Sequence, residues 1–175
     1  MNKRAGALTG ASGTYFVASQ LTFQNFHAAI TFGNAPMVDV LVSRADGAAS
    51  LALQVKTTGW AMRTRGRGKN KRPHHYEWDA GYKAAHTARK DLFYAFVDLK
   101  EFKTTPDVFL VPSGFLVKWF EPYGVLKRYR FHPSVQEMEQ FTNNWPVLRD
   151  RLEETGKVQQ PTPPYSVNRG GSPQG

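Results

Sequence analysis

The alternation of apolar and polar residues is clearest over residues 37–57, MVDVLVSRADGAASLALQVKT. Residues two apart on a β-strand point to the same face, so this stretch predicts two strands, near 38–44 and 50–57. The alternation divides their side chains between two faces. One face carries Val38, Val40, Val42, Leu51, Leu53 and Val55, and the other carries Asp39, Leu41, Ala52, Gln54 and Lys56.

The turn between the two strands determines which residues meet. Asp46-Gly47 is typical of a two-residue type I′ turn, in which both central residues have positive φ. In that register Asp39 lies opposite Gln54, with Lys56 on the diagonal, and a four-residue loop over 45–48 keeps the same pairing. A carboxylate, an amide and an ammonium are therefore expected on one patch.

The rest of the chain reads as a mixture of helices and strands. An amphipathic helix is predicted over 13–25, with Tyr15 or Phe16, Ser19, Leu21 and Phe23 on one face. A strand ending at Gly33 follows, and after the hairpin we expect a mobile loop over 59–75 and a helix over 76–90 containing Trp78, Tyr82 and Ala85. Next come a central strand over 91–99, a strand over 106–112, and a short helix with an irregular or hairpin segment over 113–133. A C-terminal helix is predicted over 134–154, capped by Ser134 and interrupted at Pro146. This order favours an α/β or α+β domain built around one sheet.

Length and composition limit the domain organisation. The chain of 175 residues is long enough for one core, and we expect a single domain over 1–155 followed by a flexible Pro/Gly-rich tail over 156–175. The absence of cysteine excludes disulfides and thiol catalysis and suits the cytoplasm. No apolar run reaches the length of a membrane helix, and no apolar segment of a secretory signal follows the basic start.

Charge points to a polyanionic partner. Lys and Arg number 23 against 14 Asp and Glu, which gives a net charge of +9. Six cations with no acid among them lie between Ala61 and Tyr76, and they are candidates for contacts to DNA phosphates. They are Arg63, Arg65, Arg67, Lys69, Lys71 and Arg72. The alternative is a solvated loop with no ligand.

The segment over 127–132 and the five histidines give weaker indications of function. The basic aromatic segment over 127–132, KRYRFH, either extends the DNA-contacting surface or is ordinary surface. His74 and His75 would point to opposite sides of a strand, and the other histidines show no zinc-binding spacing. All five histidines are therefore predicted to be structural or solvent-exposed.

The polar face of the 37–57 hairpin suits phosphodiester hydrolysis. Mg²⁺ (or Mn²⁺) takes oxygen ligands, which Asp39, Gln54 and the backbone carbonyl of Val55 can supply. Lys56 would orient the attacking water or stabilise charge on the phosphorane. The alternative is that these residues simply form the solvated face of the hairpin.

The residues of this hairpin, together with the helix before it, resemble a known family. The order of GTYFVA on a first helix, GNAPMVDVLV and LALQVKT is similar to the PD-(D/E)XK nuclease superfamily, over roughly residues 10–115. The resemblance implies a restriction-endonuclease-like fold, with a mixed central sheet flanked by helices, as in Holliday-junction resolvases. It implies that Asp39 is the metal-binding acid and that Gln54-Val55-Lys56 is the (D/E)-x-K element, in the Q-x-K form of Mrr-type members.

The sequence departs from that family on the first helix, where many relatives carry a glutamate and this chain has Thr14. Asp39 is then the only acid that the motif supplies. Either Glu77 or Asp79 contributes a ligand from the second helix, or the metal binds weakly, or activity has decayed.

The leading hypothesis is a metal-dependent DNA endonuclease with Asp39, Gln54 and Lys56 at its centre. The alternative is a catalytically inactive nuclease-like domain that binds nucleic acid or a protein partner. Cutting both strands of a duplex with one such site usually requires pairing, so a homodimer is compatible with the first hypothesis.

Overall fold

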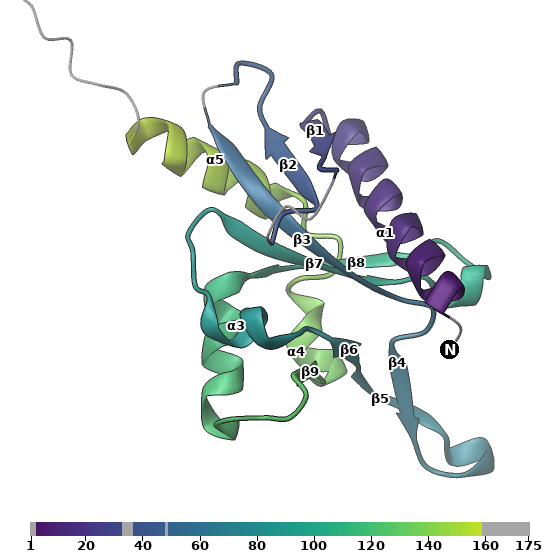
Figure 1. Ribbon diagram of the computed structural model, residues 1–175. Helices are drawn as coiled ribbons and strands as arrows, with labels where there is room; N and C mark the ends of the chain where they lie inside the picture. Colours follow the sequence, from purple (N-terminus) through teal and green to yellow (C-terminus); the bar gives the residue numbers. More distant parts are fainter. Residues whose placement is uncertain (1–2, 33–36, 48, 159–175) are drawn as a thin grey trace, which may run out of the picture.

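The core is built around β7 (Leu92–Asp98), in which every residue is buried. The computed structural model describes residues 3–32, 37–47 and 49–158 (Figure 1). β7 is buried on both faces and paired on both edges, which agrees with the continuous apolar run that predicted a central strand. Phe93, Ala95 and Val97 face one layer, and Tyr94 and Phe96 face the other.

A five-stranded mixed sheet forms the middle of the molecule, in the order β1-β2-β3-β7-β8. Its other strands are β1 (His27–Ile30), β2 (Val40–Ser43), β3 (Ser50–Thr58) and β8 (Asp107–Pro112). β3 and β7 run parallel, and the remaining neighbours are antiparallel. Together with the helices on both faces, this confirms the predicted α+β architecture.

Each face of the sheet has its own hydrophobic layer. The first layer lies under α1 (Lys3–Phe23) and α5 (Pro146–Val158), on the upper side in Figure 1. The second layer lies under short elements on the opposite side. These elements are α2 (Tyr82–His86), α3 (Ser113–Phe120), α4 (Val135–Glu139), and a small sheet of β6 (Trp78–Asp79) and β9 (Arg130–Phe131).

Helix α1 is longer than predicted, and its buried face agrees only in part with the predicted one, since Leu21 and Phe16 pack against the first layer. It begins at Lys3 rather than near residue 13, and it buries Val17 and Leu21 against the sheet. Tyr15 and Phe23 are instead 59% and 80% exposed. The close approach of the helix to β3 occurs at Gly13, which lies against Thr57.

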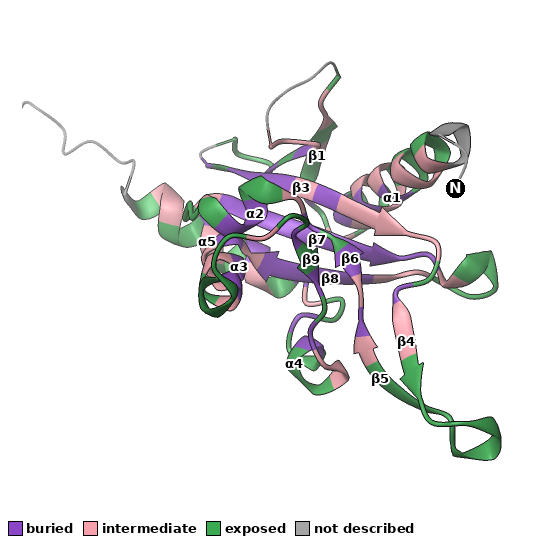
Figure 2. Ribbon diagram, turned by 60° about the horizontal axis from the view of Figure 1, so that its bottom comes forward, coloured by how far each residue is buried: buried purple, intermediate pink, exposed green. Residues whose placement is uncertain are grey.

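Residues 59–75 form an ordered hairpin, and the prediction of a loop there is wrong. β4 (Met62–Arg65) pairs antiparallel with β5 (Arg72–Tyr76) across η1 (Gly68–Asn70), a 3-10 turn. The ribbon is exposed over most of its length, as its green colour in Figure 2 shows. It has almost no apolar face, so no hydrophobic alternation marked it as a pair of strands.

The predicted helix over 76–90 is also largely wrong. Trp78 lies in β6 and pairs with Phe131, and only the five residues of α2 are helical. Gly81 separates the two elements with φ +81° and ψ 163°, a conformation essentially restricted to glycine. The buried Trp78 ring packs between β7 and β9, and this tertiary contact overrides the helical spacing.

The C-terminal part follows the prediction more closely. Ser134 caps α4 in a capping box with Glu137, and a new helix begins at Pro146. Two further 3-10 turns are η2 (Lys100–Phe102) and η3 (Glu121–Tyr123). Residues 156–158 belong to α5 rather than to the predicted tail, and the rest of that tail lies outside the described residues. Among the helices described, none has the length and apolarity that crossing a membrane requires.

Candidate active site

Asp39 lies immediately before β2, between two neighbouring backbone segments. The predicted register of the hairpin is confirmed, with Val40 opposite Leu53, and pairing ends there. The Asp39 N–H donates to the Leu53 carbonyl (2.8 Å), and its own carbonyl accepts from the Thr31 N–H (3.0 Å). Asp39 is therefore held by its backbone on both sides.

The alternation of faces breaks at Asp39. Val40 belongs to the first hydrophobic layer, whereas Val38 packs against the second. The prediction that Val38 shares a face with Val40 is therefore wrong. The Asp39 N–H meets the carbonyl of Leu53, which is already the partner of Val40, as happens when a strand carries an extra residue. Met37, with φ +67°, begins this irregular segment.

The Asp39 carboxylate bridges to β3 through its side chain. Its Oδ2 atom accepts from the Gln54 side-chain amide and from the backbone N–H of Val55 (2.6 Å). The structure therefore brings Asp39 and Gln54 together as the alternation predicts, although through a shifted backbone. Of Val55, it is the N–H rather than the carbonyl that contacts the carboxylate.

The turn that joins the strands is not of type I′. Within its described residues only Gly47 has positive φ (+66°), and its N–H donates to the Arg44 carbonyl (3.0 Å). The connection is longer than two residues, since Ser43 pairs with Ser50. The register survives because the loop remains even in length.

Lys56 follows on the same strand face as Gln54. Its neighbour on β7 is Phe96, and its Nζ lies 4.0 Å from the position a Cβ would take at Gly81. No described residue forms a hydrogen bond or an ion pair with the Lys56 ammonium. A partly buried cation without an anionic partner can act on an anion from outside the chain.

Tyr94 is the neighbour of Gln54 on β7. Burial raises the pKa of its hydroxyl to about 12. Tyr94 therefore keeps its proton at neutral pH and cannot act as a general base beside the site.

The two acids considered as additional metal ligands are already paired. Glu77 accepts from Arg130 (2.9 Å) and lies 3.8 Å from Arg63. Asp79 forms an ion pair with Arg128 (2.8 Å). Neither lies on the second helix, contrary to prediction, and within the described residues no group of three His, Cys, Asp or Glu could hold a metal ion.

Thr14 points its hydroxyl at its own helix, donating to the Gly10 carbonyl (3.2 Å). Helix α1 has no Asp or Glu, so it offers no second carboxylate. The site therefore has one acid, Asp39, one amide, Gln54, and one ammonium, Lys56.

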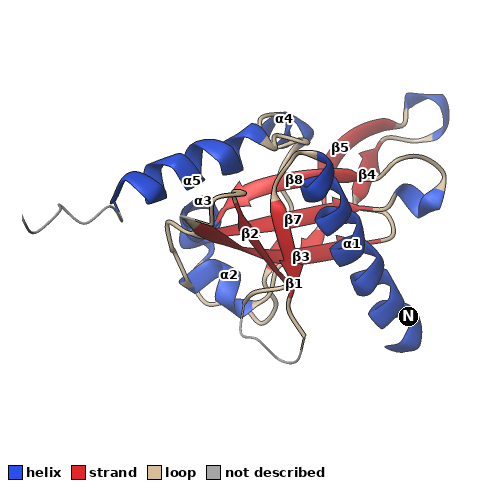
Figure 3. Cartoon of the chain, turned by 90° about the horizontal axis from the view of Figure 1, so that it is seen from above, coloured by secondary structure: helices blue, strands red, loops and turns tan. Residues whose placement is uncertain are grey.

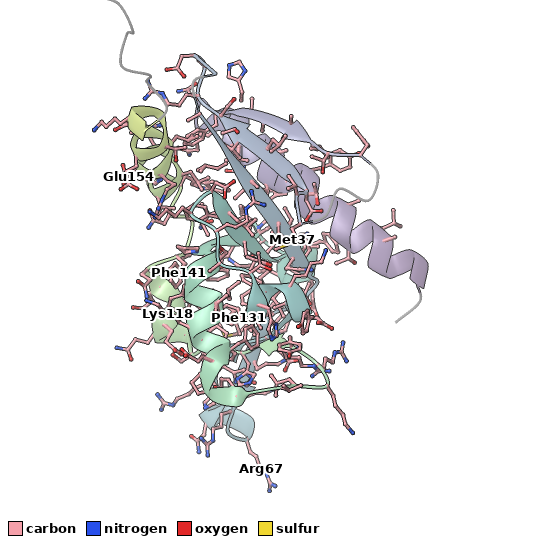
Figure 4. All side chains as sticks on the ribbon, turned by 60° about the vertical axis from the view of Figure 1, so that its left-hand side comes forward. Met37, Arg67, Lys118, Phe131, Phe141 and Glu154 are labelled. Carbon is pink, nitrogen blue, oxygen red and sulfur yellow. The ribbon has the colours of Figure 1, made fainter. Side chains whose placement is uncertain are left out.

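The six predicted DNA-contacting cations are carried by the β4–β5 ribbon. Arg67 extends from its tip, away from the body of the molecule (Figure 4). Arg63, at the base, is near Glu77. Arg65, Arg67, Lys69, Lys71 and Arg72 have no acidic partner among the residues described. By contrast, Arg128 and Arg130 of the second basic segment are neutralised by Asp79 and Glu77.

A cluster of histidines at the base of the ribbon corrects the prediction that His74 and His75 diverge. Their Nδ1 atoms lie 2.7 Å apart, and the His132 ring centroid is 6.4 Å from that of His75. Burial, followed by the proximity of His74, lowers the pKa of His75. Pro73 precedes them next to a register shift in the ribbon, which is the sequence signal for the irregularity.

Comparison with known proteins gives a likeness of fold and no likeness of sequence. No family model matches the chain, and no curated protein matches it. Among solved structures the fold is similar to that of a bacterial homing endonuclease, I-Ssp6803I, with a TM-score of 0.51 and 12% sequence identity. The match covers 87% of this chain and 94% of that chain. At this identity the likeness is one of fold alone, and it identifies no catalytic motif.

Proposed function

We propose that this protein is a divalent-metal-dependent DNA endonuclease whose centre is Asp39, Gln54 and Lys56. The observation that carries the proposal is the contact of the Asp39 carboxylate with Gln54 at β3, two residues before Lys56, which has no ionic partner among the described residues. This arrangement occurs in a fold similar to that of a homing endonuclease. We propose further that the chain is a member of the PD-(D/E)XK superfamily.

The donor set suits Mg²⁺ or Mn²⁺ bound in the way typical of substrate-assisted sites. Mg²⁺ commonly binds one or two carboxylates and completes its octahedron with waters and substrate phosphates. Asp39 offers the carboxylate, and a half-turn of the Gln54 amide presents its oxygen in place of its nitrogen. The Val55 carbonyl is a candidate third ligand on the same strand.

A divalent ion held by Asp39 and Gln54 would act as a Lewis acid and would lower the pKa of a water bound to it. The protein residues perform the remaining tasks. Asp39 is held in place by the Val55 N–H, and Lys56 has a free ammonium that stabilises negative charge developing on the phosphate. The β4–β5 ribbon, whose cations beyond Arg63 have no acidic partner among the described residues, binds the DNA backbone.

A specific observation favours the second candidate function, a nuclease-like domain that binds DNA or a protein without cleaving it. The site has one carboxylate, and Glu77 and Asp79 are occupied by arginines. A single carboxylate neutralises a divalent ion poorly. Weak metal binding would leave DNA binding intact and remove catalysis.

The deciding experiment is cleavage of supercoiled plasmid with Mg²⁺ or Mn²⁺ by the wild type, Asp39→Asn and Lys56→Met. The endonuclease proposal predicts nicking that is lost in both variants while DNA binding persists. Asp79→Asn is the matched control, since it removes a carboxylate that the structure pairs with Arg128. Full activity in Asp39→Asn, or no cleavage by the wild type with binding retained, contradicts the catalytic role.

We also propose that the active form is a homodimer joined through the outer face of α1. The sequence has no Lys, Arg, Asp or Glu from Ala5 to Val38, in a chain of net charge +9. Leu8, Tyr15 and Phe23 are exposed on this helix. An uncharged apolar face is the part of a strongly basic chain that a second copy can approach without charge repulsion.

A further inference from the structure

The turn after β7 has an unusual backbone. Lys100, Glu101 and Phe102 have φ values of +49°, +53° and +61° in succession. A left-handed conformation costs an L-residue about 1–2 kcal/mol, and it normally occurs as isolated residues. In the described part of the chain, the other non-glycine residues with positive φ are single. Three in a row therefore need surrounding structure to hold them.

That support comes from the ends of two parallel strands. The Glu101 N–H donates to the Gly59 carbonyl (2.7 Å), just beyond β3. The Lys100 N–H donates to the buried carboxylate of Asp98 (3.0 Å), and the Lys100 ammonium pairs with Asp107 (2.8 Å). The turn is thus held from three directions.

The result of this conformation is an aromatic side chain directed outward. Phe102 is 70% exposed although it follows directly from the most deeply buried strand of the sheet. A second exposed aromatic residue, Trp60, comes directly after Gly59, the partner of Glu101. Two neighbouring segments therefore each present a large aromatic residue at the same end of the sheet.

Trp60 adjoins the base of the basic ribbon, and the bond from Glu101 to Gly59 ties the η2 turn to the residue before Trp60. The Trp60 carbonyl accepts from the Arg63 guanidinium (2.9 Å), at the base of β4. Seen from above in Figure 3, the β4–β5 ribbon and the η2 turn lie toward the same end of the sheet, whereas Figures 1 and 2 show that the tip of the ribbon extends well below that turn. Exposed aromatic rings at the base of a basic ribbon are a combination with which proteins stack on bases while binding phosphates.

We propose that Phe102, assisted by Trp60, is an aromatic wedge that enters the base stack of DNA held by the β4–β5 ribbon. This inference rests on the proposed DNA binding and goes beyond it, because the ribbon alone needs only the phosphate backbone. The left-handed turn fixes the backbone of Phe102 before DNA binds, so little backbone entropy is lost when the ring inserts. The wedge distorts the duplex next to the ribbon.

The test is binding of a short DNA duplex without metal, which separates recognition from cleavage. Phe102→Ala is expected to weaken binding about 5- to 100-fold, since stacking on one base typically has this effect. The dependence of affinity on salt should not change, because no phosphate contact is lost. Phe102→Tyr should restore binding. Phe32→Ala removes a phenylalanine that is 85% exposed at the end of β1, and it should leave binding unchanged.

A mismatched duplex gives a second readout that a structural role of Phe102 would not affect. Bases that are already unstacked are easier to separate, so the wild type should prefer the mismatched duplex and Phe102→Ala should lose this preference. Equal binding by Phe102→Ala and the wild type overturns the wedge and leaves the proposed nuclease function intact. No binding by the wild type overturns both.

Discussion

The backbone N–H of Val55 donates to the side chain of Asp39 at 2.6 Å, just beyond the Val40–Leu53 pair with which the β2–β3 pairing stops. A strand residue there would normally donate to a partner carbonyl. Because Asp39 has left the register, its carboxylate takes that role. The same oxygen accepts from Gln54. One carboxylate therefore satisfies a backbone N–H at the end of the β2–β3 pairing and also forms the centre of the candidate site.

The first prediction concerns the missing acid. Gln54→Glu places a second carboxylate against Asp39, which removes a hydrogen bond and adds like-charge repulsion when no metal is bound. We expect the variant to lose about 1–3 kcal/mol of stability without metal. It should bind Mn²⁺ at least about tenfold more tightly, since unit charges 4 Å apart interact by about 4 kcal/mol at an effective dielectric of 20.

Calorimetry with Mn²⁺ and thermal unfolding with and without the ion measure both effects. Gln140→Glu is the control, because it adds the same charge at an exposed position on the far end of α4. Unchanged metal affinity in Gln54→Glu would show that this side chain does not face a bound ion.

The second prediction separates the two basic segments. The double variant Arg65→Ala and Arg67→Ala removes two cations that have no acidic partner among the described residues. Each phosphate contact contributes about 0.9 to the slope of log affinity against log salt, so the slope should fall by about 2. The double variant Arg128→Ala and Arg130→Ala changes the net charge equally but removes neutralised side chains. Its slope should change little, and equal effects of the two pairs would argue against a dedicated ribbon.

The third prediction addresses the homodimer. Tyr15→Lys places a charge on the exposed, uncharged face of α1 and should shift the chain to monomers in analytical ultracentrifugation. Monomers should still nick plasmid but should lose concerted cutting of both strands. Tyr82→Lys, on the exposed surface of α2, is the matched control. A wild type that is monomeric at every concentration at which it cuts both strands would refute the proposal.

The hairpin shows how far a sequence pattern can predict this site. Alternation identified the partners Val40 and Leu53 because a shift of one residue would expose the apolar face of both strands. It could not predict that the chain adds a residue at Asp39. The bulge depends on Met37 in a left-handed conformation, and methionine carries no signal for it. The side chains of Asp39 and Gln54 are in contact as predicted, but the extra residue that brings them together did not follow from the pattern.

Elements without an apolar face could not be predicted from the alternation of apolar and polar residues. The β4–β5 ribbon is a strand pair made almost entirely of exposed residues, so its sequence resembles that of a loop. The η2 turn contains no glycine, although all three of its residues have positive φ. Both are held by backbone contacts to residues distant in the sequence, and only the folded structure reveals these. By contrast, β7 and the Ser134 cap depend on local composition and were predicted.

The fourth prediction is a pH dependence of stability at the histidine cluster. Burial and the neighbouring His74 lower the pKa of His75 from its ordinary value of 6.5. In the unfolded chain His75 takes up a proton near 6.5, whereas the folded protein resists this. The unfolded state therefore binds more protons, and the free energy of unfolding falls as pH drops below about 6.5. The loss levels off below the folded pKa.

His75→Asn should therefore show a smaller decrease in Tm between about pH 7.5 and pH 5 than the wild type. His27→Asn, at an exposed position of β1, is the control and should behave as the wild type. An identical decrease in His75→Asn and the wild type would mean that His75 protonates equally in both states.

The last prediction tests the contact that seats α1 on the sheet. A Cβ added at Gly13 would overlap the Thr57 side chain and lie 2.7 Å from its Cγ2, whereas a Cβ at Gly10 meets nothing within 4 Å. Gly13→Ala should destabilise the protein by about 1–3 kcal/mol through overpacking, net of better helix propensity. Gly10→Ala, on the same helix, should stabilise it by up to about 1 kcal/mol. Urea denaturation measures both, and Thr57→Gly should recover part of the loss in Gly13→Ala because it removes the overlapping atoms. Equal stability of the two alanine variants would mean that α1 does not approach β3 this closely, and Thr14 would then lie farther from the strand that carries Gln54 and Lys56.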